Sequence, residues 1–210
     1  MGTQQRKINE KIKRRKDILE VAKGVFISKG LEAATMEEIA NKAELSKGTL
    51  YLYFKSKEEL YVSLVEEGAQ LFHEFFKRAT NPVLSATKQT LNLIEAFYSF
   101  YTEHRLYYTI LTSIQSGSID REKISDAVYD RIHGMAMELL EYIVNIIRKG
   151  ITDGEFIDVD PRETALSFWA LATGVFAVSD FMQRNELGEV KDKKLLDFAS
   201  DLMLARLQAV

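Results

Sequence analysis

The chain of 210 residues contains no cysteine, which excludes a disulfide scaffold and metal sites built from thiolates. Proline is scarce and no segment alternates apolar and polar residues, so we expect no β-strands. The longest stretch without a charge, residues 164–179, is shorter than a bilayer requires, and no apolar stretch follows the basic amino-terminal residues. We therefore expect no membrane span and no signal peptide, and a protein located in the cytoplasm.

The net charge of −3 conceals two oppositely charged parts. Residues 1–57 contain 13 Lys/Arg against 7 Asp/Glu, whereas residues 58–210 contain 15 against 24. A basic amino-terminal part on an acidic body indicates that only the first part meets a polyanion. Its basic arm consists of Arg6, Lys7, Lys11, Lys13, Arg14, Arg15 and Lys16. A solvated charge run, common at the start of a chain, is the other interpretation of this arm.

Helical periodicity accounts for nearly the whole chain. The predicted helices lie near residues 9–29, 36–43, 47–53, 57–78, 84–103, 104–115, 120–150, 161–184 and 190–208. Asn81-Pro82 and Asp160-Pro161 each place a capping residue before a proline, a pattern typical of helix starts. The sequence therefore predicts an all-α protein of about nine helices. In it, a long helix from residue 57 joins an amino-terminal domain of three helices to a larger carboxy-terminal domain.

The amino-terminal domain reads as three short helices in close succession. The first has a buried stripe at spacings of three and four positions, formed by Ile18, Leu19, Ala22, Val25 and Phe26. Thr35 opens the second helix as a capping box, Ser46 is a good N-cap for the third, and Ser56 begins another capping box. Leu50 and Phe54 anchor the third helix. These features predict a helix-turn-helix in residues 1–57, followed by a second domain in residues 58–210.

The remaining side chains of the third helix are polar or aromatic, and the small core does not need them. Thr49 and Tyr51 suit base edges in the major groove of DNA, while Tyr53 and nearby lysines suit phosphates. Gly48 costs about 1 kcal/mol relative to Ala inside a helix, which makes sense where a partner approaches the backbone. The predicted DNA-binding residues are Thr35, Ser46, Lys47, Gly48, Thr49, Tyr51, Tyr53 and Lys57. A three-helix cap with ordinary polar surface residues is the alternative.

This segment resembles the amino-terminal domain of TetR-type (tetracycline-repressor-like) transcriptional regulators. The resemblance covers residues 18–64 and rests on Phe26, Gly30, Thr35, Ile39, Ala40, Ala43, Ser46, Lys47-Gly48-Thr49-Leu50-Tyr51, Tyr53-Phe54 and Lys57-Glu58-Glu59-Leu60. It implies a helix-turn-helix whose second helix enters the major groove of double-stranded DNA, in a dimer that binds a palindromic operator. Glu44 departs from the family, which usually has a turn glycine there. A residue other than glycine at positive φ costs about 1–2 kcal/mol.

The rest of the chain resembles the family's ligand-binding and dimerisation domain only in outline. Aromatic residues concentrate between residues 97 and 108, where four tyrosine hydroxyls require partners, as in a large apolar pocket with few polar points. The predicted ligand-binding residues are Phe97, Tyr98, Tyr101, Tyr107, His133, Met137, Trp169 and Thr173. A role in the hydrophobic core is the other interpretation of these aromatic residues. The effector we expect is a small apolar or aromatic molecule.

Residues 164–179 are apolar on almost every side, so a helix there must be covered on every side. Gly174 permits close approach of another helix, and the last helix contributes Leu195, Leu196, Ala199, Leu202 and Met203. We therefore predict a homodimer formed through the last two helices. A ligand that prefers a different spacing of the two recognition helices weakens DNA binding. The predicted function is thus a repressor released from its operator by a small, largely apolar ligand.

Signatures of catalysis are missing from the chain. The three histidines lack the spacing of metal ligands, and there is neither a glycine-rich phosphate loop nor a G-x-S-x-G nucleophile elbow. We therefore expect no enzyme, no cofactor, no catalytic residue and no metal site. A further alternative is an all-helical small-molecule or lipid-binding protein without DNA binding, which leaves the pattern between Lys47 and Lys57 unexplained.

Overall fold

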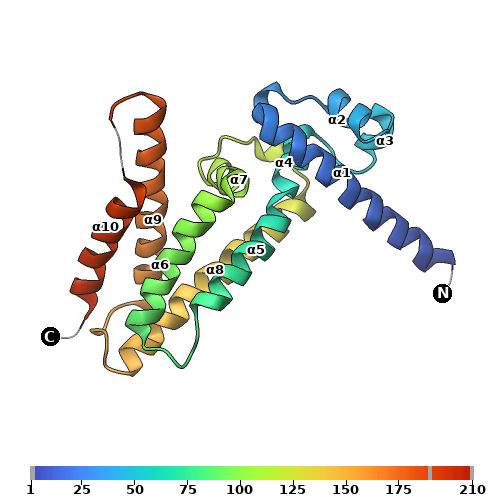
Figure 1. Cartoon of the computed structure of the whole chain (residues 1–210). Helices are drawn as coiled ribbons and strands as arrows, with labels where there is room; N and C mark the ends of the chain where they lie inside the picture. Colours follow the sequence, from blue (N-terminus) through green and yellow to red (C-terminus); the bar gives the residue numbers. More distant parts are fainter. Residues whose placement is uncertain (1–2, 189–190, 209–210) are drawn as a thin grey trace. The chain divides into compact units, whose positions relative to one another are not determined.

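The computed structural model describes residues 3–188 and 191–208, most of which are helical (Figure 1). The elements are α1 (Thr3–Ala33), α2 (Met36–Lys42), α3 (Lys47–Tyr51), α4 (Lys57–Ser63), α5 (Val65–Ala79), α6 (Ala86–Glu103), α7 (Arg105–Gln115), the 3₁₀ turn η1 (Arg121–Lys123), α8 (Asp126–Thr152), α9 (Pro161–Arg184) and α10 (Asp192–Leu207). Within these residues the only β-structure is an isolated antiparallel bridge between Phe156 and Gln208. The predicted all-α fold is confirmed.

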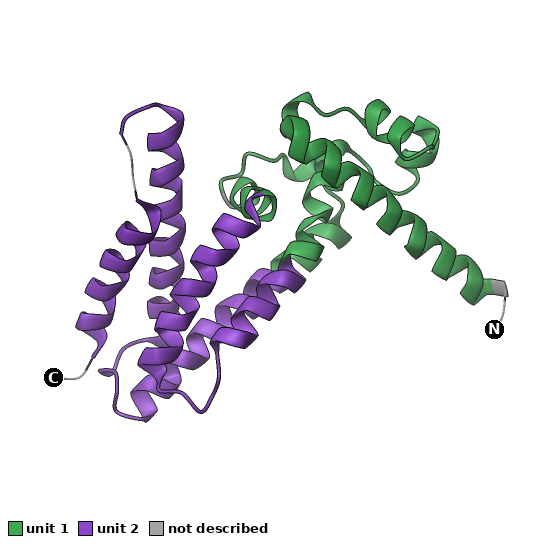
Figure 2. Ribbon diagram, viewed as in Figure 1, with its two compact units in different colours: residues 1–68, 106–133 green, residues 69–105, 134–210 purple. Residues whose placement is uncertain are grey.

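Contacts divide the chain into two compact units (Figure 2). Unit 1 contains residues 1–68 and 106–133, and unit 2 contains residues 69–105 and 134–210. Helices α5 and α8 each run from one unit into the other. Residues well beyond position 57 therefore belong to the same compact unit as the helix-turn-helix. The predicted boundary between a DNA-binding domain in residues 1–57 and a second domain in residues 58–210 is a functional division, and it stays a prediction.

The core of the helix-turn-helix consists of the residues that periodicity predicts. Ile18, Ala22 and Val25 of α1 are fully buried, as are Ile39 of α2 and Leu50 of α3. Burial of a large aliphatic side chain contributes roughly 1.5–3 kcal/mol, so this small cluster accounts for much of the domain's stability. The helical backbone of α1 breaks at Gly30, where φ is 73° and ψ is 177°, and one more turn follows. This break is the predicted stop after Lys29.

The stretch 57–78, predicted as one helix, is two helices. Helix α4 ends at Ser63 and α5 begins at Val65. The N–H of Leu64 donates to the carbonyl of Tyr61, three residues back, at 3.2 Å. This tighter turn interrupts the α-helical pattern without a proline or glycine, so the sequence carries no local signal for it. Two other boundaries also differ, because α1 begins at Thr3 and α8 begins at Asp126, after η1.

The predicted helix start at Asn81-Pro82 is wrong. Asn81 forms a turn in which its Oδ1 accepts from the N–H of Val83 at 3.0 Å. Helix α6 begins after Ser85, whose hydroxyl accepts from the N–H of Lys88 at 3.2 Å. The carboxylate of Glu155 accepts hydrogen bonds from the free N–H groups of Ala86 and Thr87, at 2.7 and 3.0 Å. A local cap and a distant carboxylate therefore hold this start together. Asp160 caps α9 as predicted, since its Oδ1 accepts from the N–H of Glu163 at 2.7 Å.

In unit 2, α9 packs against α6 and α10. Phe176 of α9 stacks on Tyr101 of α6 with ring centroids 4.0 Å apart. Large apolar side chains of α9 and α10 nevertheless remain exposed by 49–62% in the single chain: Leu166, Val178, Phe181, Phe198 and Leu202. Helix α9 is the one helix of the described residues that has the length and apolar composition to cross a membrane. Its packing against two neighbours accounts for the buried face of this helix, and the exposed face requires another partner.

Candidate nucleic-acid interface

Local capping holds the helix-turn-helix in shape. The Thr35 hydroxyl accepts from the N–H of Glu38 at 3.1 Å, and the Ser46 hydroxyl accepts from the N–H of Thr49 at 3.1 Å. Each cap satisfies a backbone donor that the first turn of a helix leaves free, and contributes about 1 kcal/mol. Because Leu50 is fully buried, these caps and this anchor together set which side of α3 faces outward.

The turn between α2 and α3 contains the predicted positive φ. Glu44 has a φ of 55°, and the N–H of Leu45 donates to the carbonyl of Ala40 at 2.9 Å. This hydrogen bond closes the end of α2 in the way that a glycine usually permits. The turn therefore keeps its shape, and the glutamate holds a backbone conformation that costs free energy.

The exposed side of α3 carries the residues predicted to contact DNA. Lys47 and Gly48 are exposed, and Tyr51 has 47% of its surface accessible. A Cβ added at Gly48 meets nothing closer than the Ser46 hydroxyl at 3.9 Å. Packing within the protein therefore does not require a glycine here. Thr49 is half-buried, and its hydroxyl lies 2.8 Å from that of Ser46, while Tyr53 is half-buried just beyond the end of α3.

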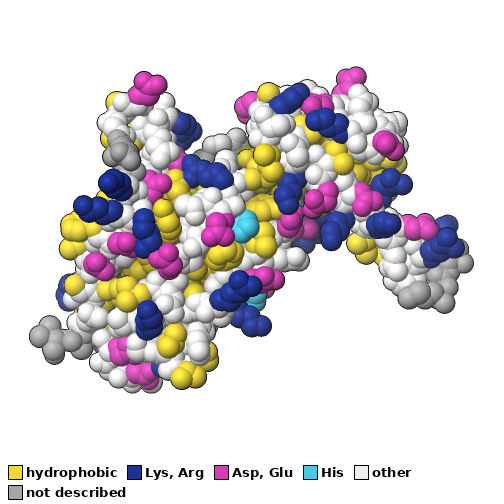
Figure 3. Space-filling view, in the orientation of Figure 1, with side chains coloured by type: hydrophobic (Ala, Val, Ile, Leu, Met, Phe, Trp, Pro, Cys, Tyr) yellow, Lys and Arg dark blue, Asp and Glu magenta, His cyan; other side chains and the backbone are white. Residues whose placement is uncertain are grey.

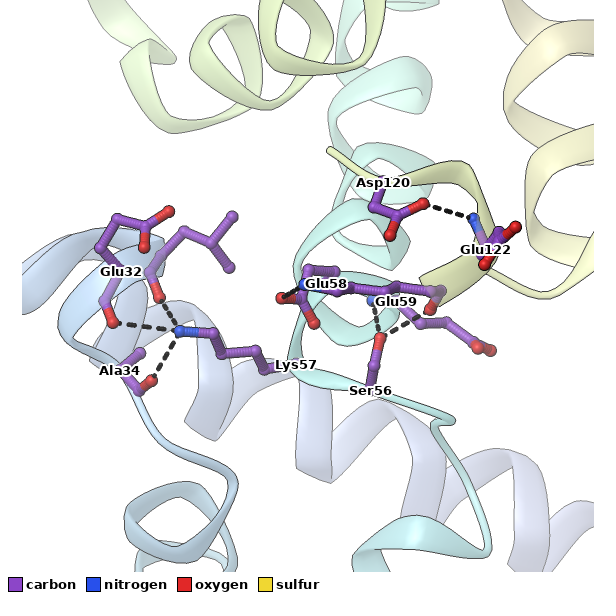
Figure 4. A network of polar contacts seen from close by, with 10 residues as sticks. Glu32, Ala34, Ser56, Lys57, Glu58, Glu59, Asp120 and Glu122 are labelled. Carbon is purple, nitrogen blue, oxygen red and sulfur yellow. Dashed lines mark hydrogen bonds and ion pairs between the residues drawn. The ribbon is translucent and has the colours of Figure 1, made fainter. Parts of the chain in front are cut away.

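Lys57 has a structural role that the sequence did not predict (Figure 4). Its amine donates to the carbonyls of Leu31 at 2.9 Å, Glu32 at 3.0 Å and Ala34 at 3.3 Å. These carbonyls lie at the end of α1, so the lysine caps that helix from 26 residues away. All three N–H donors of the ammonium are thus engaged in this conformation, and a phosphate contact by Lys57 stays a prediction.

A second set of contacts ties the start of α4 to the segment around η1 (Figure 4). The Ser56 hydroxyl donates to the carbonyl of Lys123 at 2.6 Å, and the Lys123 amine lies 3.1 Å from the Glu58 carboxylate. Burial opposes ionisation of Glu58, but hydrogen bonds from its own N–H and from Lys123 outweigh it and lower its pKa. Ser125 adds a hydrogen bond of 3.0 Å to Glu59. The sequence offered no signal for these contacts, because the partners are 65 or more residues apart.

Tyr107, one of the predicted ligand-binding residues, lies in unit 1. It is buried against α5, where a Cβ on Gly68 would come within 2.6 Å of the tyrosine ring. Burial raises the pKa of Tyr107 to about 12, and hydrogen bonding with Lys23 and Glu67 acts on it in opposite directions. Lys23 also forms an ion pair with Glu67 at 2.8 Å. This tyrosine therefore takes part in a polar link between α1, α5 and α7.

The other predicted ligand-binding residues are distributed over both units. In unit 2 the rings of Phe97 and Trp169 lie 6.3 Å apart, and the Thr173 hydroxyl donates to the Trp169 carbonyl at 2.9 Å. Tyr101 donates to Asp180 at 2.7 Å, and Tyr98 lies beneath the Lys193 amine at 5.7 Å. The structure thus brings the Phe97 and Trp169 rings together, while the Thr173 hydrogen bond lies within α9 and Tyr98 and Tyr101 take part in separate polar contacts. His133 belongs to unit 1, where it is exposed and stacks beside Tyr129.

Two surface hollows of unit 2 lie between α5 and α8. One of about 370 Å³ is lined by Ala69, Gln70, His73, Glu74, Met135, Glu138 and Leu139. The other, of about 480 Å³, is lined by His73, Met137, Glu138, Glu141, Tyr142 and Asn145. The Tyr142 hydroxyl, in the second hollow, lies 3.1 Å from a ring nitrogen of His73, which lines both hollows. Sequence reasoning named only Met137 here, because α5 and α8 are brought together only by the fold.

No group of three or more histidine, aspartate or glutamate side chains within residues 3–188 and 191–208 is arranged to hold an ion. The polar clusters found there are hydrogen-bonded caps and ion pairs instead.

Comparisons with known proteins agree with this geometry. Residues 18–64 match the family described as bacterial regulatory proteins, tetR family. YhgD of Bacillus subtilis (strain 168), an uncharacterized HTH-type transcriptional regulator, is 31% identical over 154 residues, which cover 73% of this chain and 78% of that protein. The HTH-type transcriptional repressor KstR2 of Mycolicibacterium smegmatis is 27% identical over 155 residues, or 70% and 71% of the two chains. A solved tetR-family protein from Rhodococcus RHA1 aligns at 22% identity with a TM-score of 0.69, over 94% of this chain and 98% of that one.

Proposed function

Because the chain belongs to the tetR family of bacterial regulatory proteins, we propose that it is a homodimeric repressor that a small, largely apolar ligand releases from its operator. It is a helix-turn-helix transcriptional regulator. We place the protein in the cytoplasm with the DNA it regulates, and assign it no enzyme activity. The observation that carries the DNA-binding role is the exposed side of α3, anchored from behind by the fully buried Leu50.

Gly48 provides the test of that observation. A Cβ has room at Gly48 within the protein, so Gly48→Ala should stabilise α3 by about 1 kcal/mol. If the missing side chain serves close approach to DNA, the same substitution should weaken operator binding tenfold or more. Gly24→Ala is the matched control, because Gly24 is also an exposed helical glycine with nothing within 4 Å of the added Cβ, but lies on α1.

Fluorescence anisotropy with a labelled duplex from the region upstream of the protein's own gene measures this binding. Gly24→Ala should leave the affinity unchanged. Equal affinities for Gly48→Ala and the wild type would show that α3 does not approach the groove closely. If the wild-type protein binds no duplex even at low salt, the alternative of an all-helical small-molecule or lipid-binding protein without DNA binding becomes the better interpretation.

The homodimer rests on the exposed apolar side chains of α9 and α10. Phe181 and Phe198 are exposed by 55% and 62% in the single chain, which is unusual for phenylalanines outside an interface. Replacing both with lysine should give a monomer in sedimentation velocity and lower operator affinity, since one recognition helix is lost from each complex. Val83→Lys is the control, because Val83 is 90% exposed but lies in the loop before α6. A double variant that remains dimeric would place the interface elsewhere.

The ligand proposal rests on aromatic packing beside the hollows of unit 2. Phe72, Phe76 and Phe97 have ring centroids 4.3–5.1 Å apart, and the Phe76 ring lies 6.2 Å from that of Tyr142, which lines one of the hollows. The sizes of the hollows fall within the usual range for small-molecule sites. Trp169 is the single tryptophan of the chain, so its emission reports events near Phe97.

Titration with decanoate and with naphthalene should change Trp169 emission and release labelled operator over the same concentration range. Phe97→Ala should weaken both responses, whereas Val83→Ala, in the exposed loop before α6, should leave them unchanged. Native mass spectrometry of the protein purified from cells identifies any molecule that it retains. Release of DNA without a change in emission would place the ligand away from Trp169.

A further inference from the structure

Helix α1 extends beyond the core of the helix-turn-helix (Figure 1). Residues 4–14 are all exposed, and the first fully buried side chain of the helix is Ile18. Lys7, Lys11, Arg14 and Ile18 are spaced by four, three and four positions, so they share one face of the helix. The face of α1 that is apolar inside the core is therefore basic where the helix runs past it.

This basic face lies beside the end of the recognition helix. A hollow of about 530 Å³ is lined by Lys7, Lys11, Lys13 and Arg14, by the acids Glu10 and Asp17, and by Tyr53. Four cations thus face two acids, and one of these acids is already paired, since Glu10 lies 3.1 Å from Arg6. Figure 3 shows Lys and Arg side chains along the projecting helix. The hollow is therefore cationic and includes Tyr53, a predicted DNA-binding residue just beyond the end of α3.

The four cations of the hollow differ from Arg15 and Lys23 of the same helix because they form no ion pair within the described residues. Arg15 donates to Ser63 at 3.1 Å and lies over the Phe54 ring, and Lys23 pairs with Glu67. By contrast, the four cations of the hollow form no ion pair within residues 3–188 and 191–208. Like charges one helical turn apart destabilise a helix by about 0.2–0.5 kcal/mol per pair. An isolated basic helix of this length is also marginal in water, so it gains most from an anionic partner.

We propose that this face of α1 contacts the DNA backbone beside the groove that α3 enters, and extends the operator footprint outward. The inference rests on the proposed DNA binding and deepens it. Residues 7 to 14 span about 10 Å at 1.5 Å per residue. One strand of DNA carries a phosphate every 3.4 Å of axis, so about three phosphates lie within this length. Three cations on one face match that number, and they add affinity without reading sequence.

Lys11→Gln tests the proposal against Lys16→Gln. Both lysines are exposed on α1, but Lys16 lies five positions on, on a different side of the helix, and does not line the hollow. Glutamine is a good helix former, so neither variant should lose helix content by circular dichroism. Each phosphate contact contributes about 0.9 to the slope of log K against log salt, and a dimer carries two copies. Lys11→Gln should therefore lower the slope by about 2, and Lys16→Gln should leave it unchanged.

The triple variant Lys7→Gln, Lys11→Gln, Arg14→Gln should lower the slope by about 5 and lose affinity equally for operator and unrelated duplex. It should also lose hydroxyl-radical protection at the outer edges of the footprint, while the central protection from α3 remains. Equal slopes for Lys11→Gln and the wild type, or an equal decrease for Lys16→Gln, would overturn the inference. Failure of the wild type to bind duplex would instead overturn the proposed function, so the two failures are distinguishable.

Discussion

Glu44 holds a positive φ in the turn before the recognition helix, and its replacement separates backbone strain from charge. The φ of 55° costs a residue other than glycine about 1–2 kcal/mol. Glycine avoids this cost but loses more conformational freedom on folding, by about 0.5–1 kcal/mol. Glu44→Gly should therefore raise the free energy of unfolding by roughly 0.5–1 kcal/mol per chain. For a protein of this size, each kcal/mol raises Tm by about 2–4 °C.

Glu44→Gln is the matched variant, because it removes the charge and keeps the Cβ that causes the strain. Glu44 is exposed, and within residues 3–188 and 191–208 it forms no ion pair, so Glu44→Gln should change stability by less than about 0.5 kcal/mol. Both variants remove an acid beside α3, so both should tighten operator binding to the same extent.

Urea unfolding followed by circular dichroism and anisotropy with labelled operator measure the two effects separately. Equal stabilisation by glycine and glutamine would show that the charge, and not the φ angle, is the unfavourable term. Destabilisation by glycine would show that the turn in solution does not hold the positive φ. Tighter DNA binding by Glu44→Gly alone would mean that turn shape, rather than charge, limits the interface.

Four further substitutions test the packing and the polar contacts. Lys57→Ala should lower the free energy of unfolding, measured by urea denaturation, by about 1–3 kcal/mol, because three carbonyls at the end of α1 lose their donor. Unchanged stability together with weaker DNA binding would show that Lys57 contacts phosphate and does not stabilise α1. Gly134→Ala should raise Tm, with a gain of about 1 kcal/mol, because the added Cβ meets open space. Gly150→Ala should lower Tm, because the added Cβ would lie 2.1 Å from a buried ring; a rise in both would refute the close packing at Gly150. Burial opposes ionisation of Glu67, but hydrogen bonds from α1 and α7 outweigh it and lower its pKa. The ionised carboxylate should therefore stabilise the fold above pH 4.5, and this stabilisation should fade as the pH falls further. Glu67→Gln should reduce the loss of stability in acid, and an unchanged loss would count against the polar link between α1, α5 and α7.

Features that depend on neighbours within four residues were predictable from the sequence. The caps at Thr35, Ser46, Ser56 and Asp160 form as predicted, because each hydroxyl or carboxylate needs only the N–H three positions ahead. The buried stripe of α1 follows equally from local spacing, whereas the positive φ of Glu44 was expected from the resemblance to the TetR family, which usually has a glycine there. For the same reason the recognition helix could be located before any coordinates were known.

Features that depend on distant partners were not predictable. Glu155 accepts from free N–H groups at the start of α6, and the amine of Lys57 donates to carbonyls up to 26 residues back in the chain. Tyr107 and Trp169 were grouped by their aromatic character, but they belong to different compact units. A sequence pattern gives the direction of a side chain on its own helix, and not the helix that it meets.

Residue order by itself therefore determined the helices, their caps and the surface of α3 that faces outward, because backbone hydrogen bonds and amphipathic spacing act over a few positions. Only the tertiary structure decided which cations are used inside the protein and which remain available to a partner. It tied Arg15, Lys23 and Lys57 to acceptors far away in the chain and left Lys7, Lys11 and Arg14 on an open face. The physical reason is that a charge is neutralised by whatever lies near it in space, and that neighbour is set by packing.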